Sequence, residues 1–367
     1  MLSVIKYLGS KRTLVPVLGA IASESGASDA VDLFTGTTRV AQEFKRRGLR
    51  VTANDVASYS KVMADCYIGI NADLVDATEL RSALDHLQHL PGKRGYFTRT
   101  FCEKSRFFQA QNGMRVDAIR DAIEEYYSNS WMRPALMTSL MLAADRVDST
   151  TGVQMAYLKD WAPRAYNDLE LRMPDLLPGS GFVEQEDALR LASELPRTQL
   201  MYLDPPYNQH RYFTNYHIWE TLVRWDAPES YGIACKRIDS RDDSTKSVFN
   251  MKREMPTQMR SLLLTINTEL AVVSYNNESW ISPEQMMAAL REAGFEDVRL
   301  LSFDYKRYVG AQIGIYNPSG DKVGKISHLR NLEYVFLAGS TDVVDACAAT
   351  VEGRTATAMR ELAPTLF

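Results

Sequence analysis

The sequence predicts an α/β fold, in which helices cover both faces of a largely parallel sheet. Residues 200–203 form an apolar run that stops abruptly at Asp204-Pro205-Pro206-Tyr207. Central parallel strands have such runs because both of their faces are buried. Residues 30–41 and 49–55 supply two more strand patterns, and the first leads through a glycine turn into an amphipathic helix.

The N-terminal stretch opens with a turn that carries a glycine and three basic residues. Apolar residues at positions 14, 17, 18 and 21 then predict a helix. Lys11 lies where this helix begins, which is an unfavourable end of the helix dipole for a cation. We therefore expect Lys11, with Tyr7 nearby, to face an anionic group; a solvated basic start of the chain is the alternative.

The strand and turn at residues 30–41 indicate a nucleotide-type site that contains Asp32, Phe34 and Gly36. The turn is not Gly-x-Gly-x-x-Gly, so it does not support a dinucleotide pyrophosphate site. The next strand ends at Asp55, about 20 residues later, where α/β folds place a carboxylate against ribose hydroxyls. S-adenosyl-L-methionine fits this pattern because it has a nucleoside but no phosphate. A purely structural role for these residues is the alternative.

Residues 56–95 look helical and mostly polar, and residues 96–175 depart from the α/β rhythm. Apolar residues recur at helical spacing in the second stretch, which predicts a mainly helical insertion between the second and third strands. Its entrance, residues 96–108, interleaves aromatic residues with Arg99, Lys104 and Arg106. Such a mixture suits a nucleic-acid backbone and its bases. Aromatic packing beneath a helical cap is the alternative.

A third strand pattern, near residues 181–186, ends at Asp187-Ala188. In a doubly wound sheet this acid borders the same cleft as Asp204, so we expect it to meet an adenine amino group. An N-cap role for Asp187 is the alternative.

The stretch Asp204-Pro205-Pro206-Tyr207 suits chemistry on the exocyclic amino group of a base. The Asp204 carboxylate and the Pro205 carbonyl would each accept one N–H, which frees the nitrogen lone pair from the ring. Pro206 stiffens the chain at the end of the strand, and Tyr207 would stack on the base. The alternative is a strand end with a Pro-Pro turn and a packed ring.

Downstream, Arg211 and Tyr212 lie in a polar, aromatic stretch of the kind expected around a base and its neighbours. Residues 232–260 look like a long polar loop, which we interpret as a phosphate-contacting lid through Lys246, Lys252 and Arg253. A solvated loop is the alternative. A strand at 269–277, a helix at 283–293 and strands near 298–305 and 332–338 would complete the sheet, with a peripheral tail from 341 to 367.

Composition sets further bounds. The 367 residues are 45% hydrophobic and 24% charged, as in ordinary globular proteins. No run approaches the roughly 20 apolar residues of a membrane span, and no signal peptide is evident. The four cysteines are far apart and the five histidines are scattered, so we expect reduced thiols in the cytoplasm and no metal site. A formal net charge of −4 argues weakly against non-specific nucleic-acid binding, although a local basic face remains compatible with it.

Together, these motifs resemble the Dam-type, alpha-group DNA adenine-N6 methyltransferases over residues 4–338. The stretches that carry the resemblance are Tyr7-x-Gly9-x-Lys11, Asp32-Leu33-Phe34-Thr35-Gly36-Thr37, Asn54-Asp55, Asp187-Ala188 and Asp204-Pro205-Pro206-Tyr207. Residues 215–221 and 273–278 are similar to the FokI-modification branch of that group. One departure is the first turn, Thr35-Gly36-Thr37-Thr38, where the family often has a second glycine.

The resemblance implies a class I methyltransferase fold with a seven-stranded sheet. It implies S-adenosyl-L-methionine contacts at Tyr7, Lys11, Asp55 and Asp204, with the Gly36 turn beneath the cofactor and Asp187 at its adenine ring. Residues 1–95 and 176–340 would form the catalytic domain, and residues 96–175 the target-recognition insertion.

The reaction that we expect is direct in-line methyl transfer to adenine N6 of double-stranded DNA, with base flipping. No covalent enzyme intermediate is expected, because no cysteine lies in a strand-end motif. A restriction endonuclease acting on the same site is a possible partner. Alternatives are cytosine-N4 transfer, an RNA or protein methyltransferase, and a non-catalytic cofactor- or DNA-binding module.

Overall fold

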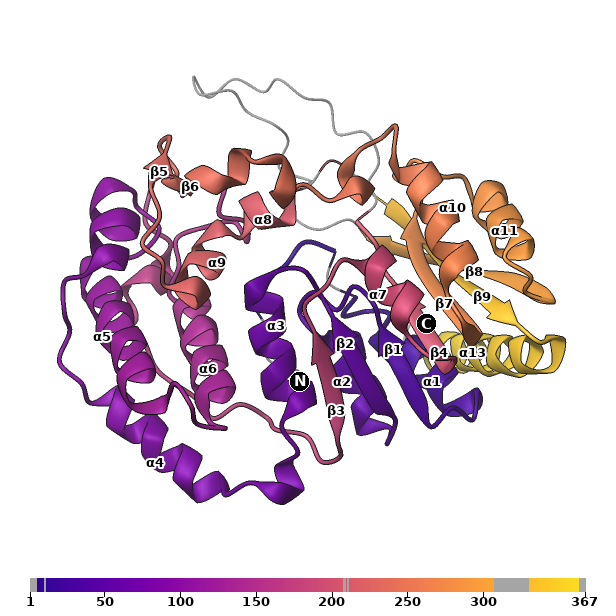
Figure 1. Ribbon diagram of the computed structural model, residues 1–367, viewed down its shortest axis with the longest axis horizontal. Coiled ribbons are helices and arrows are strands. Elements are labelled where there is room, and N and C mark those ends of the chain that lie inside the picture. Colours follow the sequence, from indigo (N-terminus) through magenta and orange to yellow (C-terminus); the bar gives the residue numbers. More distant parts are fainter. Residues whose placement is uncertain (1–4, 10, 207–208, 210, 307–329, 363–367) are drawn as a thin grey trace.

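A computed structural model describes residues 5–9, 11–206, 209, 211–306 and 330–362 of the chain. Within those residues, one mixed seven-stranded sheet has the order β3-β2-β1-β4-β7-β9-β8 (Figure 1). The α/β class and the seven-stranded mixed sheet that the sequence predicts are therefore confirmed. Its strands are β1 (Asp29–Asp32), β2 (Arg50–Asn54), β3 (Gly181–Glu184), β4 (Thr198–Leu203), β7 (Thr268–Asn276), β8 (Asp297–Lys306) and β9 (Arg330–Gly339).

Strand direction reverses at β9 and reverses back at β8. The pairs from β3 to β7 are parallel, whereas β9 pairs antiparallel with both β7 and β8. An antiparallel strand begins at the edge where its parallel neighbours end. The start of β9 therefore lies at the same edge as the carboxyl ends of β4 and β7, which is where open α/β sheets bind ligands.

The apolar run in β4 is buried on both faces, as the sequence predicts. Leu200 and Tyr202 belong to one core cluster, and Met201 and Leu203 belong to the other. This alternation follows from the two-residue period of a strand. Helices α1 (Val15–Glu24), α2 (Arg39–Arg46) and α13 (Thr341–Leu362) contribute to the first cluster, and α7 (Ala188–Glu194), α10 (Met255–Thr265) and α11 (Pro283–Glu292) to the second.

A block of helices lies beside the sheet and shares the core cluster that contains Leu200 and Tyr202 (Figure 1). Its members α4 (Ala77–Gln88), α5 (Ala110–Tyr127) and α6 (Arg133–Arg146) pack on one another, and α6 also packs on α3 (Ser58–Ala64) and α9 (His217–Arg224). The predicted helical stretch between the second and third strands is thus present, and it shares one core cluster with the sheet. Its role as a target-recognition domain, and its boundaries at 96 and 175, stay predictions.

Short elements connect the larger ones. Two π-helical turns are η1 (Asp65–Gly69) and η3 (Thr98–Lys104), and two 3₁₀ turns are η2 (Ala72–Leu74) and η4 (Pro163–Tyr166). The short helix α8 (Tyr212–Asn215) precedes α9. We call residues 226–254 the strap; it holds a small hairpin and three 3₁₀ turns, namely β5 (Ser230–Tyr231), β6 (Lys236–Arg237), η5 (Ile238–Arg241), η6 (Asp243–Thr245) and η7 (Val248–Asn250).

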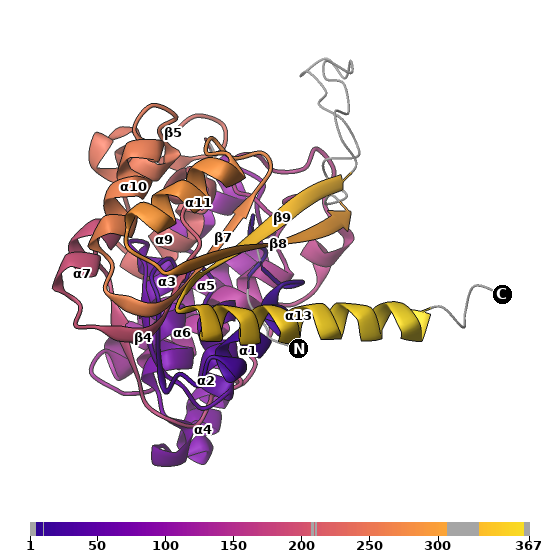
Figure 2. The ribbon, with the colours of Figure 1, turned by 90° about the vertical axis from the view of Figure 1, so that its right-hand side faces the viewer.

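Two expectations for the C-terminal half are wrong. The polar loop expected over 232–260 ends early, because α10 begins at Met255 and buries Met255, Met259 and Leu262 along one face. The tail from 341 is not peripheral in its first turns. Figure 2 shows α13 beside α1, β8 and β9, where Val344 and Cys347 are fully buried. Both α10 and α13 have a narrow apolar stripe among polar residues, so the sequence pattern gives only a weak helix signal for them.

Candidate active site

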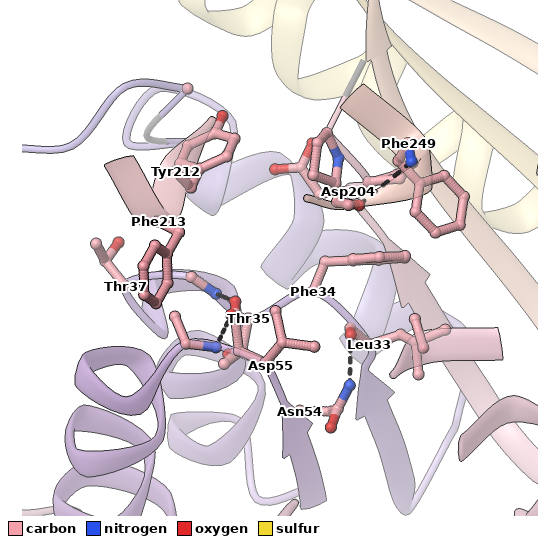
Figure 3. A pocket seen from close by; sticks show the side chains of 18 of the residues that line it. Leu33, Phe34, Thr35, Thr37, Asn54, Asp55, Asp204, Tyr212, Phe213 and Phe249 are labelled. Atoms are coloured by element: carbon pink, nitrogen blue, oxygen red, sulfur yellow. Dashed lines mark hydrogen bonds between the residues drawn. The ribbon is translucent and has the colours of Figure 1, made fainter. Parts of the chain in front are cut away.

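A cavity of about 360 Å³ opens at the carboxyl ends of β1, β2 and β4 (Figure 3). That volume lies within the range of small-molecule sites. The structure brings together all the residues that the sequence predicts for a cofactor site: Tyr7, Lys11, Asp32, Phe34, Gly36, Asp55, Asp187, Ala188 and Asp204. Pro205 and Pro206 also line the cavity, whereas Tyr207 lies outside the described residues.

The turn after β1 is built around Gly36, whose φ is +50°. Its backbone N–H donates to Oδ2 of Asp55 at 2.9 Å. A Cβ at this position would lie 3.3 Å from the ring of Tyr7, so glycine is needed for both conformation and space. Thr38, at the position where a second glycine would relax the turn, has a φ of +63° and is fully buried. The departure noted in the sequence therefore places a β-branched residue in a left-handed conformation.

Asp55 presents a carboxylate to the cavity from the end of β2. Its Oδ1 accepts from the N–H of Ala57 at 2.9 Å, while Oδ2 accepts from Gly36. Burial raises the pKa of Asp55 to about 6, although both backbone hydrogen bonds lower it. Because an ionised carboxylate has about four acceptor positions, each oxygen keeps capacity for a ligand hydroxyl.

Asp32 supports the same turn from beneath. Its Oδ2 accepts from Oγ1 of Thr35 at 3.0 Å and from the N–H of Ala41 at 3.2 Å. Burial raises the pKa of Asp32 to about 7, and the nearby Asp204 raises it further. The buried Oδ1 of Asp32 has no hydrogen-bond partner within the described part of the chain. Asp32, which lines the cavity, thus keeps one buried acceptor that the turn does not use.

Aromatic rings form two walls of the cavity. The Tyr7 ring stacks on Tyr212 at 5.2 Å and on Tyr216 at 4.6 Å between centroids. Across the cavity, the edge of one ring meets the face of the other in the pair Phe34 and Phe249, at 5.3 Å. Figure 3 shows the labelled rings of Tyr212, Phe34 and Phe249 around the opening. Flat apolar walls of this kind hold planar ring systems.

Asp204 lies at the end of β4, 18% exposed on its side chain, and pairs with Lys11. The Lys11 Nζ lies 3.1 Å from Oδ1 of Asp204 and 3.4 Å from Oε2 of Glu333. Lys11 is only 6% exposed, so the expectation that it faces an anionic group is met by two carboxylates of the protein itself. Burial raises the pKa of Asp204 to about 6, while Lys11 lowers it.

Asp187 is the N-cap of α7 and also borders the cavity. Its Oδ1 accepts from the N–H groups of Leu189 at 3.0 Å and Arg190 at 3.2 Å, which makes it the N-cap of α7. It lines the cavity as well. Contact with an adenine ring stays a prediction.

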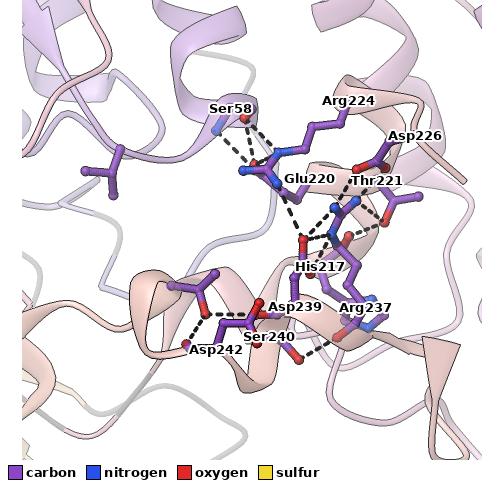
Figure 4. A network of polar contacts seen from close by, with 12 residues as sticks. Ser58, His217, Glu220, Thr221, Arg224, Asp226, Arg237, Asp239, Ser240 and Asp242 are labelled. Carbon is purple, nitrogen blue, oxygen red and sulfur yellow. Dashed lines mark hydrogen bonds and ion pairs between the residues drawn. The ribbon is translucent and has the colours of Figure 1, made fainter. Parts of the chain in front are cut away.

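The strap closes one side of the cavity through Lys246, Phe249 and Asn250. The strap is anchored by Arg237, whose side chain is 2% exposed. Its guanidinium donates two hydrogen bonds to Asp226, at 2.6 and 2.7 Å, and two to Asp239, at 2.8 and 3.0 Å (Figure 4). Four short charge-assisted bonds to one guanidinium hold the two ends of the hairpin together.

A buried carboxylate connects the strap to the wall beside Asp55. Glu220 is fully buried and accepts from the N–H of Ser58 at 3.0 Å and from its Oγ at 2.7 Å. It also pairs with Nε of Arg224 at 2.7 Å, and Nη1 of Arg224 lies 3.5 Å from Asp239 (Figure 4). Arg224 lines the cavity and lies over the ring of Phe213, so a single network runs from the strap to the cofactor side of the site.

The predicted DNA-binding residues divide into two groups. Tyr212 and Lys246 line the cavity, and Arg211 lines a neighbouring hollow. The other five residues are exposed on the surface and do not line the cavity, namely Arg99, Lys104, Arg106, Lys252 and Arg253. Arg106 bonds the carbonyl of Lys159 at 2.9 Å and lies over the ring of Trp161.

The aromatic residues between those cations are not available to nucleic-acid bases. Phe97, Phe101, Phe107 and Phe108 are at most 1% exposed and belong to the core. The packing alternative for these rings is therefore the one that the structure supports. Phe97 and Phe101 are one helical turn apart and face the core together, while Phe107 and Phe108 enter it from the bend that follows.

Several cavity residues were not predicted from the sequence. Phe213, Arg224, Phe249 and Asn250 line the cavity, and Glu333 reaches it through Lys11. Phe213 and Arg224 flank residues 215–221, the stretch that resembles the FokI-modification branch, and this proximity was the available signal. Glu333 lies in a strand pattern without any motif, so its role depends on strand order alone.

The thiols take no part in the site. Cys66, Cys102, Cys235 and Cys347 are free, and none lines the cavity. Burial raises the pKa of Cys66 to about 12. Over the described ranges, no cluster of three or more His, Cys, Asp or Glu side chains is arranged to hold a metal ion. In the same ranges, none of the helices has the length and apolarity needed to cross a membrane.

Comparison with known proteins identifies the family. Residues 7–289 match the family described as D12 class N6 adenine-specific DNA methyltransferase. The type II methyltransferase M.NlaIII of Neisseria lactamica is 30% identical over 348 residues, which cover 91% of this chain and 98% of that protein. The modification methylase StsI of Streptococcus sanguinis is 30% identical over 83% of this chain and 49% of its own length. The type II methyltransferase M.FokI of Planomicrobium okeanokoites is 27% identical over 83% of this chain and 50% of its own length. This chain thus spans about half the length of the StsI and FokI enzymes.

Proposed function

We propose, since this chain belongs to the D12 class of N6 adenine-specific DNA methyltransferases, that it methylates adenine N6 at a specific sequence in double-stranded DNA. The observation that carries this proposal is the shared cavity. Asp204 and its two prolines line the same space as the Gly36 turn and Asp55. A group that activates an amino nitrogen therefore lies beside a group suited to a nucleoside.

The residues fit S-adenosyl-L-methionine. The two Asp55 oxygens have acceptor capacity for ribose hydroxyls, and the partnerless Oδ1 of Asp32 offers one more acceptor for an ammonium or hydroxyl. Gly36 lets the backbone approach closely, and the Phe34 and Phe249 rings suit a flat base. When bound, this cofactor supplies a methyl group on a sulfonium that is ready for direct transfer.

Asp204 and Pro205 would prepare the amino nitrogen. The nitrogen is a poor nucleophile while its lone pair is delocalised into the adenine ring. The Asp204 carboxylate accepts one N–H and the Pro205 carbonyl accepts the other, which pulls the nitrogen toward tetrahedral geometry. The Asp204 carboxylate then receives the proton that the methylated nitrogen must lose. This role requires the ionised form of Asp204.

The target adenine must leave the duplex, because the cavity lies at the end of β4 and cannot admit a base pair. Tyr207, outside the described residues, stays our prediction for the ring that stacks on the flipped base. We assign phosphate contacts to the exposed cations at 99, 104, 106, 211, 252 and 253, with Tyr212 and Lys246 at the cavity mouth. The helical block at 96–175 would read the target sequence.

Relatives of this chain are named modification methylases and type II methyltransferases, which supports a role in DNA modification. A restriction endonuclease that acts on the same site is the partner that such a role implies for this chain. We also propose a cytoplasmic location, with which the four free thiols are consistent.

Single-molecule sequencing of DNA from a methylation-free host that expresses this chain tests the function. We expect N6-methyladenine in one short motif, and its absence when the host expresses Asp204→Ala. N4-methylcytosine would assign the cavity to cytosine instead. Unmodified DNA, despite cofactor binding by calorimetry, would refute DNA as the substrate.

A further inference from the structure

A carboxylate, an ammonium and a second carboxylate form a row at the edge of the cavity. The Lys11 Nζ lies between Oδ1 of Asp204 at 3.1 Å and Oε2 of Glu333 at 3.4 Å. The three side chains come from the segment before α1, from the end of β4 and from β9. All three are largely buried, with side-chain exposures of 6%, 18% and 20%.

Strand direction explains how Glu333 reaches the site. Glu333 pairs with Asn276, the last residue of β7, in the antiparallel register. Since β9 begins where the parallel strands end, its first residues lie beside the ligand-binding edge. Glu333 also lies beyond residue 289, where the family match ends, so the comparison with known proteins does not assign it.

We propose that Glu333 is a positioning residue for methyl transfer, which shares the Lys11 ammonium with Asp204 and so keeps Asp204 oriented and basic. This inference rests on the proposed function of the cavity. Lys11 bound to two carboxylates is held on the Oδ1 side of Asp204, and the other oxygen stays available to the amino group. Lys11 bound to Asp204 alone would neutralise that carboxylate and weaken it as an acceptor.

The electrostatics agree with this arrangement. The charged and titratable groups that face Asp204 are Lys11, Glu333, Asp32 from β1 and Tyr202 from β4. Burial raises the pKa of Asp204 most, Lys11 lowers it and Glu333 raises it. Loss of the Glu333 charge should therefore make Asp204 more acidic, and a more acidic carboxylate is a weaker hydrogen-bond acceptor.

The test compares wild type, Glu333→Gln and Glu333→Asp in single-turnover methylation of a target duplex from pH 5 to pH 9. We expect Glu333→Gln to lower the rate at pH 8 by roughly ten-fold. Removing the hydrogen-bond partner of a metal-ligating side chain costs about 10–100-fold in activity, and we expect the lower end for this positioning role. Its acid limb should shift to lower pH, so that it keeps a larger share of its own maximum at pH 5.5. Glu333→Asp should restore part of the rate.

Two controls separate positioning from general stability. Glu269 lies on neighbouring β7 and forms an exposed ion pair with Arg197. Glu269→Gln should leave both the methylation rate and its pH profile unchanged. In a Lys11→Met background, Glu333→Gln should lower the rate by less than it does in wild type, because the positioning role runs through Lys11 and only the direct effect of the Glu333 charge on Asp204 remains. Additive losses, or a lowered rate with an unshifted acid limb, would overturn the proposal.

A measurement without catalysis keeps this inference distinct from the proposed function. Protein labelled with ¹³C at aspartate carboxyls gives a resonance for Asp204, assigned by its loss in Asp204→Asn. We expect its titration midpoint to be lower in Glu333→Gln than in wild type. An unchanged midpoint would refute the role of Glu333 even if the DNA is methylated. A wild type that does not methylate adenine would refute the function alone.

Discussion

The backbone N–H of Gly36 donates to Oδ2 of Asp55 at 2.9 Å, and this bond joins the turn after β1 to the end of β2. The two residues that the sequence marks for a nucleoside are thus held in one unit. The bond depends on the positive φ of Gly36, so the backbone of the turn and the carboxylate beside it are set together.

Gly36→Ala should weaken S-adenosyl-L-methionine binding by at least ten-fold. A Cβ would lie 3.3 Å from the Tyr7 ring, and the left-handed conformation costs an L-residue about 1–2 kcal/mol. Isothermal titration calorimetry measures the effect. Gly26→Ala is the control, because Gly26 also has a positive φ but has nothing within 4 Å of an added Cβ. Equal affinity of the two variants would show that the Gly36 turn does not contact the cofactor.

Methylation should decline as the pH falls through about 6. The pKa of Asp204 is raised to about 6 by burial, and only the ionised form can receive the proton that the methylated nitrogen loses. Single-turnover rates from pH 5 to pH 8, with saturating DNA and cofactor, give the midpoint. A rate that stays flat down to pH 5 would contradict a need for ionised Asp204 within this range.

Asp32→Asn should flatten the dependence of stability on pH. The folded-state pKa of Asp32, about 7, lies above its ordinary value, so the folded protein binds the extra proton between about pH 4 and pH 7. The stabilising contribution is present below the ordinary pKa and is lost as the pH rises through 7, by up to about 4 kcal/mol. Urea unfolding at pH 5 and pH 8 measures it. Asp175→Asn, an exposed acid, is the control, and an identical pH difference in both variants would contradict the prediction.

Arg237→Ala should loosen the strap without unfolding the sheet. The change removes the cation that Asp226 and Asp239 share. Their side chains are 40% and 26% exposed, so solvent screening should hold the cost below the roughly 3–5 kcal/mol of a fully buried pair. We expect faster hydrogen exchange over residues 226–254 and a several-fold higher KM for the cofactor, because the strap lines the cavity. Arg190→Ala, which loses exposed ion pairs with Glu186 and Glu194, should do neither. Unchanged exchange in the strap would remove Arg237 as its anchor.

Replacing Lys252 and Arg253 by glutamine should weaken DNA binding uniformly across sequences. If each side chain contacts one phosphate, the slope of log K against log salt should fall by about 2. The double variant Arg190→Gln with Arg260→Gln removes the same charge from exposed ion pairs and is the control. A slope equal to that of wild type would exclude both residues from the phosphate contacts.

The sequence predicts the part of the fold in which pattern and chemistry coincide. The apolar run before Asp204 can only be a strand buried on both faces, and a strand, a glycine turn and an acid can only meet at one edge of a parallel sheet. All the predicted cofactor residues therefore meet at one cavity. Local patterns fix these features because each depends on a few neighbouring residues.

Features that depend on distant packing were not predicted. The phenylalanines at 97 and 101 alternate with basic residues, which suits either nucleic acid or a core, and burial alone decides. The helix at Met255 has few apolar residues on its other faces, so its polar neighbours conceal it. Glu333 enters the site because β9 runs antiparallel between β7 and β8, and no local signal gives the direction of that strand.

The order in which protein synthesis delivers these groups has a consequence of its own. Lys11 is 322 residues from Glu333, and β9 follows every other strand of the sheet. At 5–20 residues per second, a ribosome adds those residues over roughly 15–65 s. For the last 129 residues of that interval, roughly 6–26 s, the nascent chain has Lys11 and Asp204 but lacks the second carboxylate. Once β7 is made, its outer edge has no strand beside it until β9 follows. An unpaired edge is a template for pairing with another chain, so this interval is when the protein most needs protection by chaperones.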